Sequence, residues 1–115
     1  MLYTDQGEFE EASRVLKRAL AVNKTFPVAL VTMGNLYQKT DRAEKAIKYH
    51  QRALEYNPHE IQALIGLGNA YAGIYDSVNA IYWYKEVLKI DENTAEAHFN
   101  LGNTYFLMEQ TDVAI

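Results

Sequence analysis

The sequence contains no cysteine, which excludes disulfide bonds, thiol nucleophiles and cysteine-based metal sites and fits a reducing compartment. It has no apolar run that approaches the length needed to span a membrane, and its N-terminus lacks a basic segment followed by a hydrophobic one. We therefore expect a soluble, cytoplasmic protein without membrane insertion. At 115 residues with 49% hydrophobic content, the chain can build one continuous core but no second domain.

Positive charge is scarce. The chain has 11 Lys and Arg against 15 Asp and Glu, a formal net charge of −4. Nonspecific nucleic-acid binding needs clustered cations, so we expect no nucleic-acid partner. Residues 27–60 are nearly neutral, with five Lys/Arg against four Asp/Glu, whereas residues 61–115 carry two against seven. Lys45, Lys48 and Arg52 form a basic stripe at helical spacing, which we interpret as a solvated outer face.

Catalytic and metal-binding patterns are also missing. The only imidazoles are His50, His59 and His98, and none has a histidine four residues on or a cysteine partner. No glycine-rich phosphate loop is present. We therefore expect a protein that is not an enzyme and that holds no cofactor and no metal.

What the sequence does have is a strict period of 34 residues. The columns that recur without insertion or deletion include Tyr3, Tyr37, Tyr71 and Tyr105; Ala12, Ala46, Ala80 and Ala114; Gly34, Gly68 and Gly102; and Asn35, Asn69 and Asn103. A fixed period in this range is typical of a solenoid, in which each unit buries its apolar face against its neighbours. Function is then expected on a repeated surface and not in a single pocket.

Within each period the apolar residues fall at the spacing of two helices. The predicted helices span about 8–22, 27–39, 43–56, 61–73, 77–90 and 95–108. Residues 1–4 are expected to be the tail of a preceding helix, and residues 112–115 the opening of a following one. No stretch alternates at period two for long enough to indicate a strand, so the prediction is one all-helical unit.

Individual residues explain how each predicted hairpin closes. Thr40 and Asp41 supply polar turn chemistry and a cap for the next helix, and Pro58 stops the second helix. Glycine inside a helix costs about 1 kcal/mol relative to alanine, so the glycine column needs a packing reason. We expect Gly34 to face Ala46, which would let the two helix axes approach closely.

These residues resemble the tetratricopeptide repeat (TPR) family, whose pattern is W-x₂-L-G-x₂-Y, then A-x₃-F, A and P. The first copy reads Leu30, Met33-Gly34, Tyr37, Ala46, His50, Ala53 and Pro58. The next reads Leu64, Leu67-Gly68, Tyr71, Ala80, Tyr84, Val87 and Glu92, and the last begins His98, Leu101-Gly102, Tyr105 and Ala114. The resemblance runs from end to end. Its departures are Leu or His in place of Trp, His50 in an aromatic column, and Lys24 and Glu92 where Pro is common.

The resemblance implies an all-α, right-handed superhelical solenoid of antiparallel helix hairpins. It comprises two full 34-residue repeats, at 27–60 and 61–94, flanked by partial ones at 1–26 and 95–115. In this family the first helices of the hairpins line a concave groove that binds peptides or partner helices, and most members are scaffolds or adaptors. We therefore expect a protein-interaction scaffold or adaptor whose partner is a protein or peptide, although the fold leaves that partner open.

The groove residues are expected on the face of each first helix opposite the Tyr/Gly stripe. They are Val28, Val31, Asn35, Gln38, Gln62, Ile65, Asn69, Ala72, Glu96, Phe99, Asn103 and Phe106. Their spacing of three and four places each set on one side of its helix.

Two columns of this predicted groove have alternative interpretations. Val31, Ile65 and Phe99 form an apolar column that we expect to be exposed in the groove, the alternative being packing against the adjacent repeat. The asparagine column either pairs with the backbone of an extended peptide or stabilises neighbouring helices, because an amide both donates and accepts.

One TPR activity can be weighed directly. Members that grip the C-terminal carboxylate of heat-shock chaperones use a clamp of Lys, Asn and Arg on this face. The positions that would be basic read Val31, Thr32, Gln62, Gly66, Glu96 and Asn100 here. That activity is not expected, and the face suits a hydrophobic or mildly basic peptide, or an amphipathic helix.

The ends of the sequence fall inside hairpins, which leaves further alternatives. The surface around Leu101, Tyr105 and Leu107 should be adhesive if no capping helix covers it. Either the sequence is an excerpt from a longer repeat protein, or copies stack end to end as a self-assembling scaffold, a homo-oligomer through the array ends. A further alternative is the recruiting arm of a larger enzyme.

Overall fold

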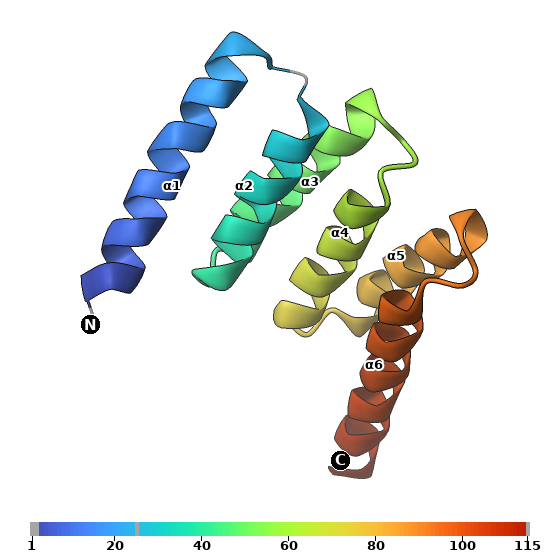
Figure 1. Ribbon diagram of the computed structural model, residues 1–115. Coiled ribbons are helices and arrows are strands. Elements are labelled where there is room, and N and C mark those ends of the chain that lie inside the picture. The colour runs from blue at the N-terminus through green and yellow to red at the C-terminus, as the bar shows by residue number, and fades with distance from the viewer. Residues whose placement is uncertain (1–2, 25, 115) are drawn as a thin grey trace.

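The helices begin and end close to where the 34-residue pattern predicts them. The computed structural model describes the backbone of residues 3–24 and 26–114 and the side chains of residues 7–24 and 26–110. This part of the chain contains no strand. Its six helices are α1 (Tyr3–Val22), α2 (Pro27–Lys39), α3 (Ala43–Tyr56), α4 (Ile61–Gly73), α5 (Ser77–Ile90) and α6 (Ala95–Ala114). The chain is thus an all-α solenoid of helix hairpins, as predicted (Figure 1).

The two end helices are longer than predicted. Inside the hairpins the turn is made at Asp41 and Tyr75, which have positive φ angles of 61° and 63°. The residues in the same column at the ends, Gly7 and Glu109, lie inside α1 and α6. We attribute the difference to packing, because the turn forms where the two helices that it joins contact each other. Residues 3–4 and 112–114 therefore continue α1 and α6, and residues 1–2 and 115 lie outside the described part of the chain.

The first hairpin closes differently from the prediction. Thr40 donates its hydroxyl to the carbonyl of Tyr37 at 3.0 Å and so completes the end of α2. Arg42 is the N-cap of α3, and no side chain caps that helix. The expected cap from Thr40 and Asp41 is therefore wrong, because the hydroxyl is already used on the preceding helix. As predicted, α3 ends before Pro58, at Tyr56.

The first helices of the hairpins converge and the second helices diverge. The helix α2 contacts α4, and α4 contacts α6, whereas α3 and α5 make no contact with each other in the described chain. Figure 1 shows α2, α4 and α6 in one layer with α3 and α5 behind them. A stack whose front helices touch while its rear helices are apart curves toward the front. The inner face of the curve therefore belongs to α2, α4 and α6.

The core runs through the whole stack. Its first part joins α1, α2 and α3 to Ala63 and Ala70 of α4, and its second part joins α4, α5 and α6. Leu54 packs against both parts, so the core is continuous. The radius of gyration of 15.2 Å exceeds the value of about 13 Å for a compact domain of roughly this length, as an elongated stack requires.

Candidate functional site

All twelve predicted groove residues lie on α2, α4 and α6, the helices of the inner face. The structure divides them by exposure. The exposed ones are Val28, Asn35, Gln62, Glu96, Phe99, Asn103 and Phe106, the half-buried ones are Gln38, Asn69 and Ala72, and the buried ones are Val31 and Ile65. The surface that a partner can reach is therefore smaller than the sequence suggested.

The expected exposure of the apolar column is wrong for two of its three members. Val31 is 6% exposed and Ile65 is 2% exposed, whereas Phe99 is 73% exposed. Val31 belongs to the first part of the core, and Ile65 packs with Ala97 in the second part. The cause is the direct approach of neighbouring first helices, which covers this column wherever a further first helix follows. Phe99 lies on α6, which no further helix follows among the described residues.

The asparagine column also splits. The side-chain oxygen of Asn69 accepts a hydrogen bond from the Tyr84 hydroxyl at 2.5 Å and another from the side-chain amide of Asn100 at 3.2 Å. These bonds tie α4 to α5 and to α6, so Asn69 stabilises neighbouring helices. Asn35 and Asn103 are exposed, and their amides are available to a ligand.

Gln38 is half-buried and contacts α4. Its side-chain amide donates to the backbone carbonyl of Asn69 at 3.5 Å. It also lies against Gly73, where an added Cβ would come within 2.7 Å of that amide nitrogen. Gln38 therefore links α2 to α4, while its side-chain oxygen is buried without a partner.

Four exposed residues on α6 form the largest reachable part of the predicted groove. We call Glu96, Phe99, Asn103 and Phe106 the α6 strip; they are spaced three, four and three residues apart and so share one side of the helix. Burial, and next the charge of Glu96, raise the pKa of Tyr84 to about 12. The charge of Glu96, at the start of α6, therefore acts on the buried Tyr84 hydroxyl of α5.

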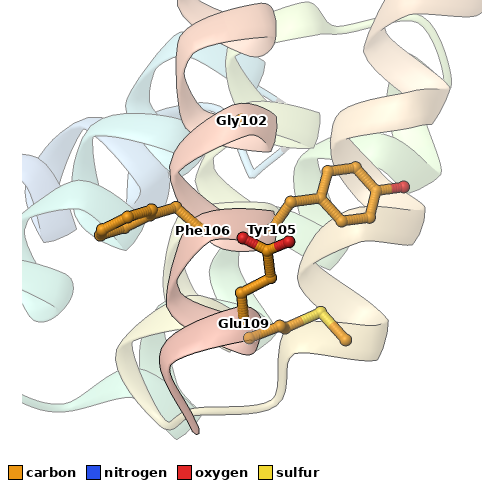
Figure 2. Close-up of a pocket in the computed structure, with 5 residues that line it drawn as sticks. Gly102, Tyr105, Phe106 and Glu109 are labelled. Carbon is orange, nitrogen blue, oxygen red and sulfur yellow. The ribbon is translucent and has the colours of Figure 1, made fainter. Parts of the chain in front are cut away.

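A hollow of about 560 Å³ opens beside the C-terminal half of this strip (Figure 2). The residues that line it are Gly102, Tyr105, Phe106, Met108 and Glu109. Tyr105 and Phe106 point to opposite sides of α6 (Figure 2). Of the three residues expected to form an adhesive surface, Tyr105 and Leu107 are exposed and Leu101 is half-buried.

His50 is fully buried between two hairpins. Its ring lies against Gly34 of α2 and Gly66 of α4, so an added Cβ at either glycine would come under 3.0 Å from the ring. The atoms nearest to an added Cβ at Gly34 therefore belong to the imidazole of His50, whereas the sequence had suggested Ala46. Both ring nitrogens lack a hydrogen-bond partner. Burial lowers the pKa of His50 to about 4, so the ring is neutral near pH 7.

Two further features were sought in the described residues: a group of metal ligands and a membrane-spanning helix. No three His, Cys, Asp or Glu residues within 7–24 and 26–110 are grouped so that they could hold a metal ion. Among the helices that the structure describes, none unites the length and the apolar character that crossing a membrane requires.

Sequence reasoning missed the hydrogen bonds that converge on Asn69. The signal was available in the repeating columns. Tyr84 lies 34 residues after His50 and Asn100 lies 34 residues after Gly66, so each occupies a column that holds a different residue one repeat earlier. A tyrosine hydroxyl and the side-chain amides of Asn69 and Asn100 together provide the donors and acceptors that a buried polar network needs.

Two family models match the sequence, in agreement with this fold. The model described as "Tetratricopeptide repeat" matches residues 25–93, more than half of the chain. A second model, described as "TPR repeat", matches residues 2–41 and 79–108. A search of curated proteins found no match.

Solved structures of the same fold include several TPR domains. The first TPR of Spaghetti (RPAP3) bound to the HSP90 peptide SRMEEVD is 20% identical, with a TM-score of 0.83 over 93% of this chain and 85% of that one. The first TPR domain of human RPAP3 is 19% identical, with a TM-score of 0.87 over 98% and 89%. The Sgt2 TPR domain from Aspergillus fumigatus is 21% identical, with a TM-score of 0.84 over 93% and 72%. At these identities the likeness shows the fold alone.

Proposed function

Because the chain belongs to the tetratricopeptide repeat family, we propose that it is an interaction scaffold that binds an extended peptide or a partner helix on the inner face of α2, α4 and α6. The observation that carries the proposal is the α6 strip. Its two phenylalanines are exposed on the side that the stack curves around. Exposed apolar residues that are grouped on one face commonly mark a binding surface.

A neighbour in structure adds support for this mode of binding. The first TPR of Spaghetti (RPAP3) was solved with the peptide SRMEEVD, so a stack of this shape can hold a short segment. That peptide is acidic, whereas α2, α4 and α6 of this chain contain Lys39 as their only Lys or Arg. The proposal therefore concerns the surface and the mode of binding, and not that ligand.

The test is capture of partners from a lysate of the source cells, followed by mass spectrometry. The variant Phe99→Glu/Phe106→Glu should lose partners that the unmodified chain retains, because two carboxylates would replace exposed apolar contacts. Ile65 is not a suitable target, since a carboxylate at a 2% exposed position would disrupt the core.

A matched control is available on the outer surface. Val78 and Tyr82 are also exposed, on α5, so Val78→Glu/Tyr82→Glu makes the same change in charge away from the inner face. Loss of the same partners with both double variants, or with neither, would overturn the proposed groove. Circular dichroism of each variant checks that helicity is intact.

A second candidate function, end-to-end self-assembly, rests on a different observation. An added Cβ at Gly102 would meet nothing within 4 Å, whereas Gly34 and Gly68 face the rings of His50 and Tyr84. Leu16 of α1 stands in the same column as these two rings. The α1 helix of a second copy would therefore bring Leu16 over Gly102 and repeat an interface that the chain already contains twice.

Light scattering after size exclusion tests this second candidate. Assembly through the ends predicts a mass that rises with concentration for the unmodified chain and a constant mass for Gly102→Arg, which fills the open position. A single monomer mass at every concentration contradicts it.

A further inference from the structure

The inner face carries charge of one sign. Among its exposed groove residues, Glu96 is the only one with an ionisable side chain. The one Lys or Arg of α2, α4 and α6, Lys39, lines a separate hollow with Glu8 and Phe9 of α1. No described cation forms an ion pair with Glu96.

Three cations of the described chain outside α2, α4 and α6 have contacts of their own. Arg42 lies over the ring of Phe9 at 4.9 Å, and Lys45 lies over the ring of Tyr37 at 5.5 Å. Lys89 pairs with a carboxylate of its own helix, at 2.7 Å. A ligand on the inner face therefore meets an uncompensated negative charge.

The surroundings of Glu96 favour a cationic ligand. The residue lies in the first turn of α6. Three residues on, the exposed ring of Phe99 shares its side of the helix. A carboxylate beside an aromatic face attracts an ammonium or guanidinium group through both charge and cation–π contact.

The other half of the α6 strip has a different chemistry. Phe106 is exposed next to the 560 Å³ hollow and offers apolar area. Asn103 lies between the two phenylalanines and is exposed, so its amide can both donate to and accept from a peptide backbone. From the start of α6 toward its end, the strip presents carboxylate, ring, amide and ring.

On the basis of the groove-binding function proposed above, we propose that the α6 strip selects peptide segments that place a Lys or Arg side chain at Glu96 and Phe99 and a bulky apolar side chain at Phe106. Acidic segments are rejected, because the inner face offers them Glu96 and no cation. The occupant is therefore a basic, apolar segment of a partner protein, and its binding weakens as salt rises because Glu96 is exposed.

The test uses a displayed library of random twelve-residue peptides, selected on the full chain. We expect the retained peptides to be enriched in Lys and Arg together with aromatic or aliphatic residues, and depleted in Asp and Glu. One retained peptide is then synthesised with a fluorescent label. Its affinity is measured by anisotropy at low and high salt.

Variants with a matched control localise the effect. Glu96→Gln should weaken binding of the labelled peptide about 1.5- to fivefold, the range for one exposed ion pair, and should flatten the salt dependence. Glu44→Gln removes the same charge from the exposed surface of α3 and should leave the affinity unchanged. Phe99→Ala should also weaken binding, whereas Tyr82→Ala on α5 should not.

Each outcome separates this inference from the proposed function. Retained peptides that lose affinity with Phe99→Ala but show no basic bias and no response to Glu96→Gln would overturn the charge preference and leave groove binding intact. A library that yields no binder, or binders indifferent to every change in the strip, would overturn both.

Discussion

The two complete hairpins share one backbone plan but fill their centres differently. In the hairpin of α2 and α3, the buried ring is His50, whose two nitrogens have no partner. In the hairpin of α4 and α5, the equivalent ring is Tyr84, whose hydroxyl donates to Asn69. The asparagine in the same column of the first hairpin, Asn35, remains exposed. Two differences in the repeating columns, Tyr84 for His50 and Asn100 for Gly66, thus separate an amide that joins helices from one that is exposed.

The turns of the two hairpins also differ, because only the second has a side-chain cap on the helix that follows. The side chain of Asp76 accepts a hydrogen bond from the backbone of Asn79 at 3.2 Å and caps α5, whereas α3 has no side-chain cap. The second hairpin therefore has a capped helix and a satisfied polar centre. We expect the first hairpin to open more readily, since an unpaired buried polar group costs about 1–3 kcal/mol.

The largest expected effect comes from filling the space beside His50. Gly66→Ala would place a Cβ under 3.0 Å from a ring that Gly34 already confines from the other side. We expect the free energy of unfolding to fall by about 3 kcal/mol, the upper part of the usual range for overpacking. Urea unfolding followed by the fluorescence of Trp83 measures it.

The matched control for that change is Gly102→Ala, where an added Cβ meets nothing. It should stabilise α6 by about 1 kcal/mol through helix propensity alone. Equal stability of Gly66→Ala and the unmodified chain would mean that His50 does not occupy the space between the two glycines.

Acid should weaken the first hairpin through His50. The pKa of this buried imidazole is lowered from 6.5 to about 4, so the unfolded chain takes up a proton that the folded chain excludes. The contribution is present above pH 6.5 and is lost as the pH falls from 6.5 to 4, by about 3 kcal/mol in all. Unfolding measured across this range should show a steeper decline than in His50→Leu, and parallel curves would contradict the assignment.

Removing the Tyr84 hydroxyl should have a smaller effect on the second hairpin. Tyr84→Phe deletes the 2.5 Å hydrogen bond to Asn69 while the Asn100 amide still donates to the same oxygen. We expect a loss of about 1 kcal/mol in the free energy of unfolding. Tyr82→Phe on the exposed side of α5 is the control, and an equal change in both would show that the hydroxyl contributes nothing specific.

The smallest effect concerns the turn residue Tyr75. It is 92% exposed with a φ of 63°, so the side chain gains little burial in a backbone conformation that suits Asn better. Tyr75→Asn should raise the free energy of unfolding by about 0.5 kcal/mol. Asp41→Asn, in the same column of the first hairpin, should leave it unchanged because Asp tolerates this conformation. A loss of stability in Tyr75→Asn would show that the tyrosine makes a contribution of its own.

The fold could be predicted from the sequence because the 34-residue columns fix both the period and the face of each helix. The predicted bounds of the four central helices, 27–39, 43–56, 61–73 and 77–90, agree with the structure. The lengths of the two end helices were predicted wrongly, because a turn beside Gly7 depends on a helix contact that the sequence pattern does not encode.

The candidate site could be predicted only in part. The resemblance to the TPR family implied a groove on the first helices, and helical spacing grouped its residues on one face of each, but neither predicted their exposure. Val31 and Ile65 are covered because neighbouring first helices touch, and this distance of approach is a property of the assembled stack. The role of Asn69 depends on Tyr84, a residue 15 positions away on another helix.

The most direct measurement is chemical-shift mapping by NMR of the isotope-labelled chain, titrated with a peptide retained from the display library. Groove binding predicts that the largest perturbations fall on Glu96, Phe99 and Phe106, with smaller ones at Asn35 and Gln62 across the inner face. Perturbations centred on Lys48 of α3 or on Val78 and Tyr82 of α5 would place the ligand on the outer surface and contradict it.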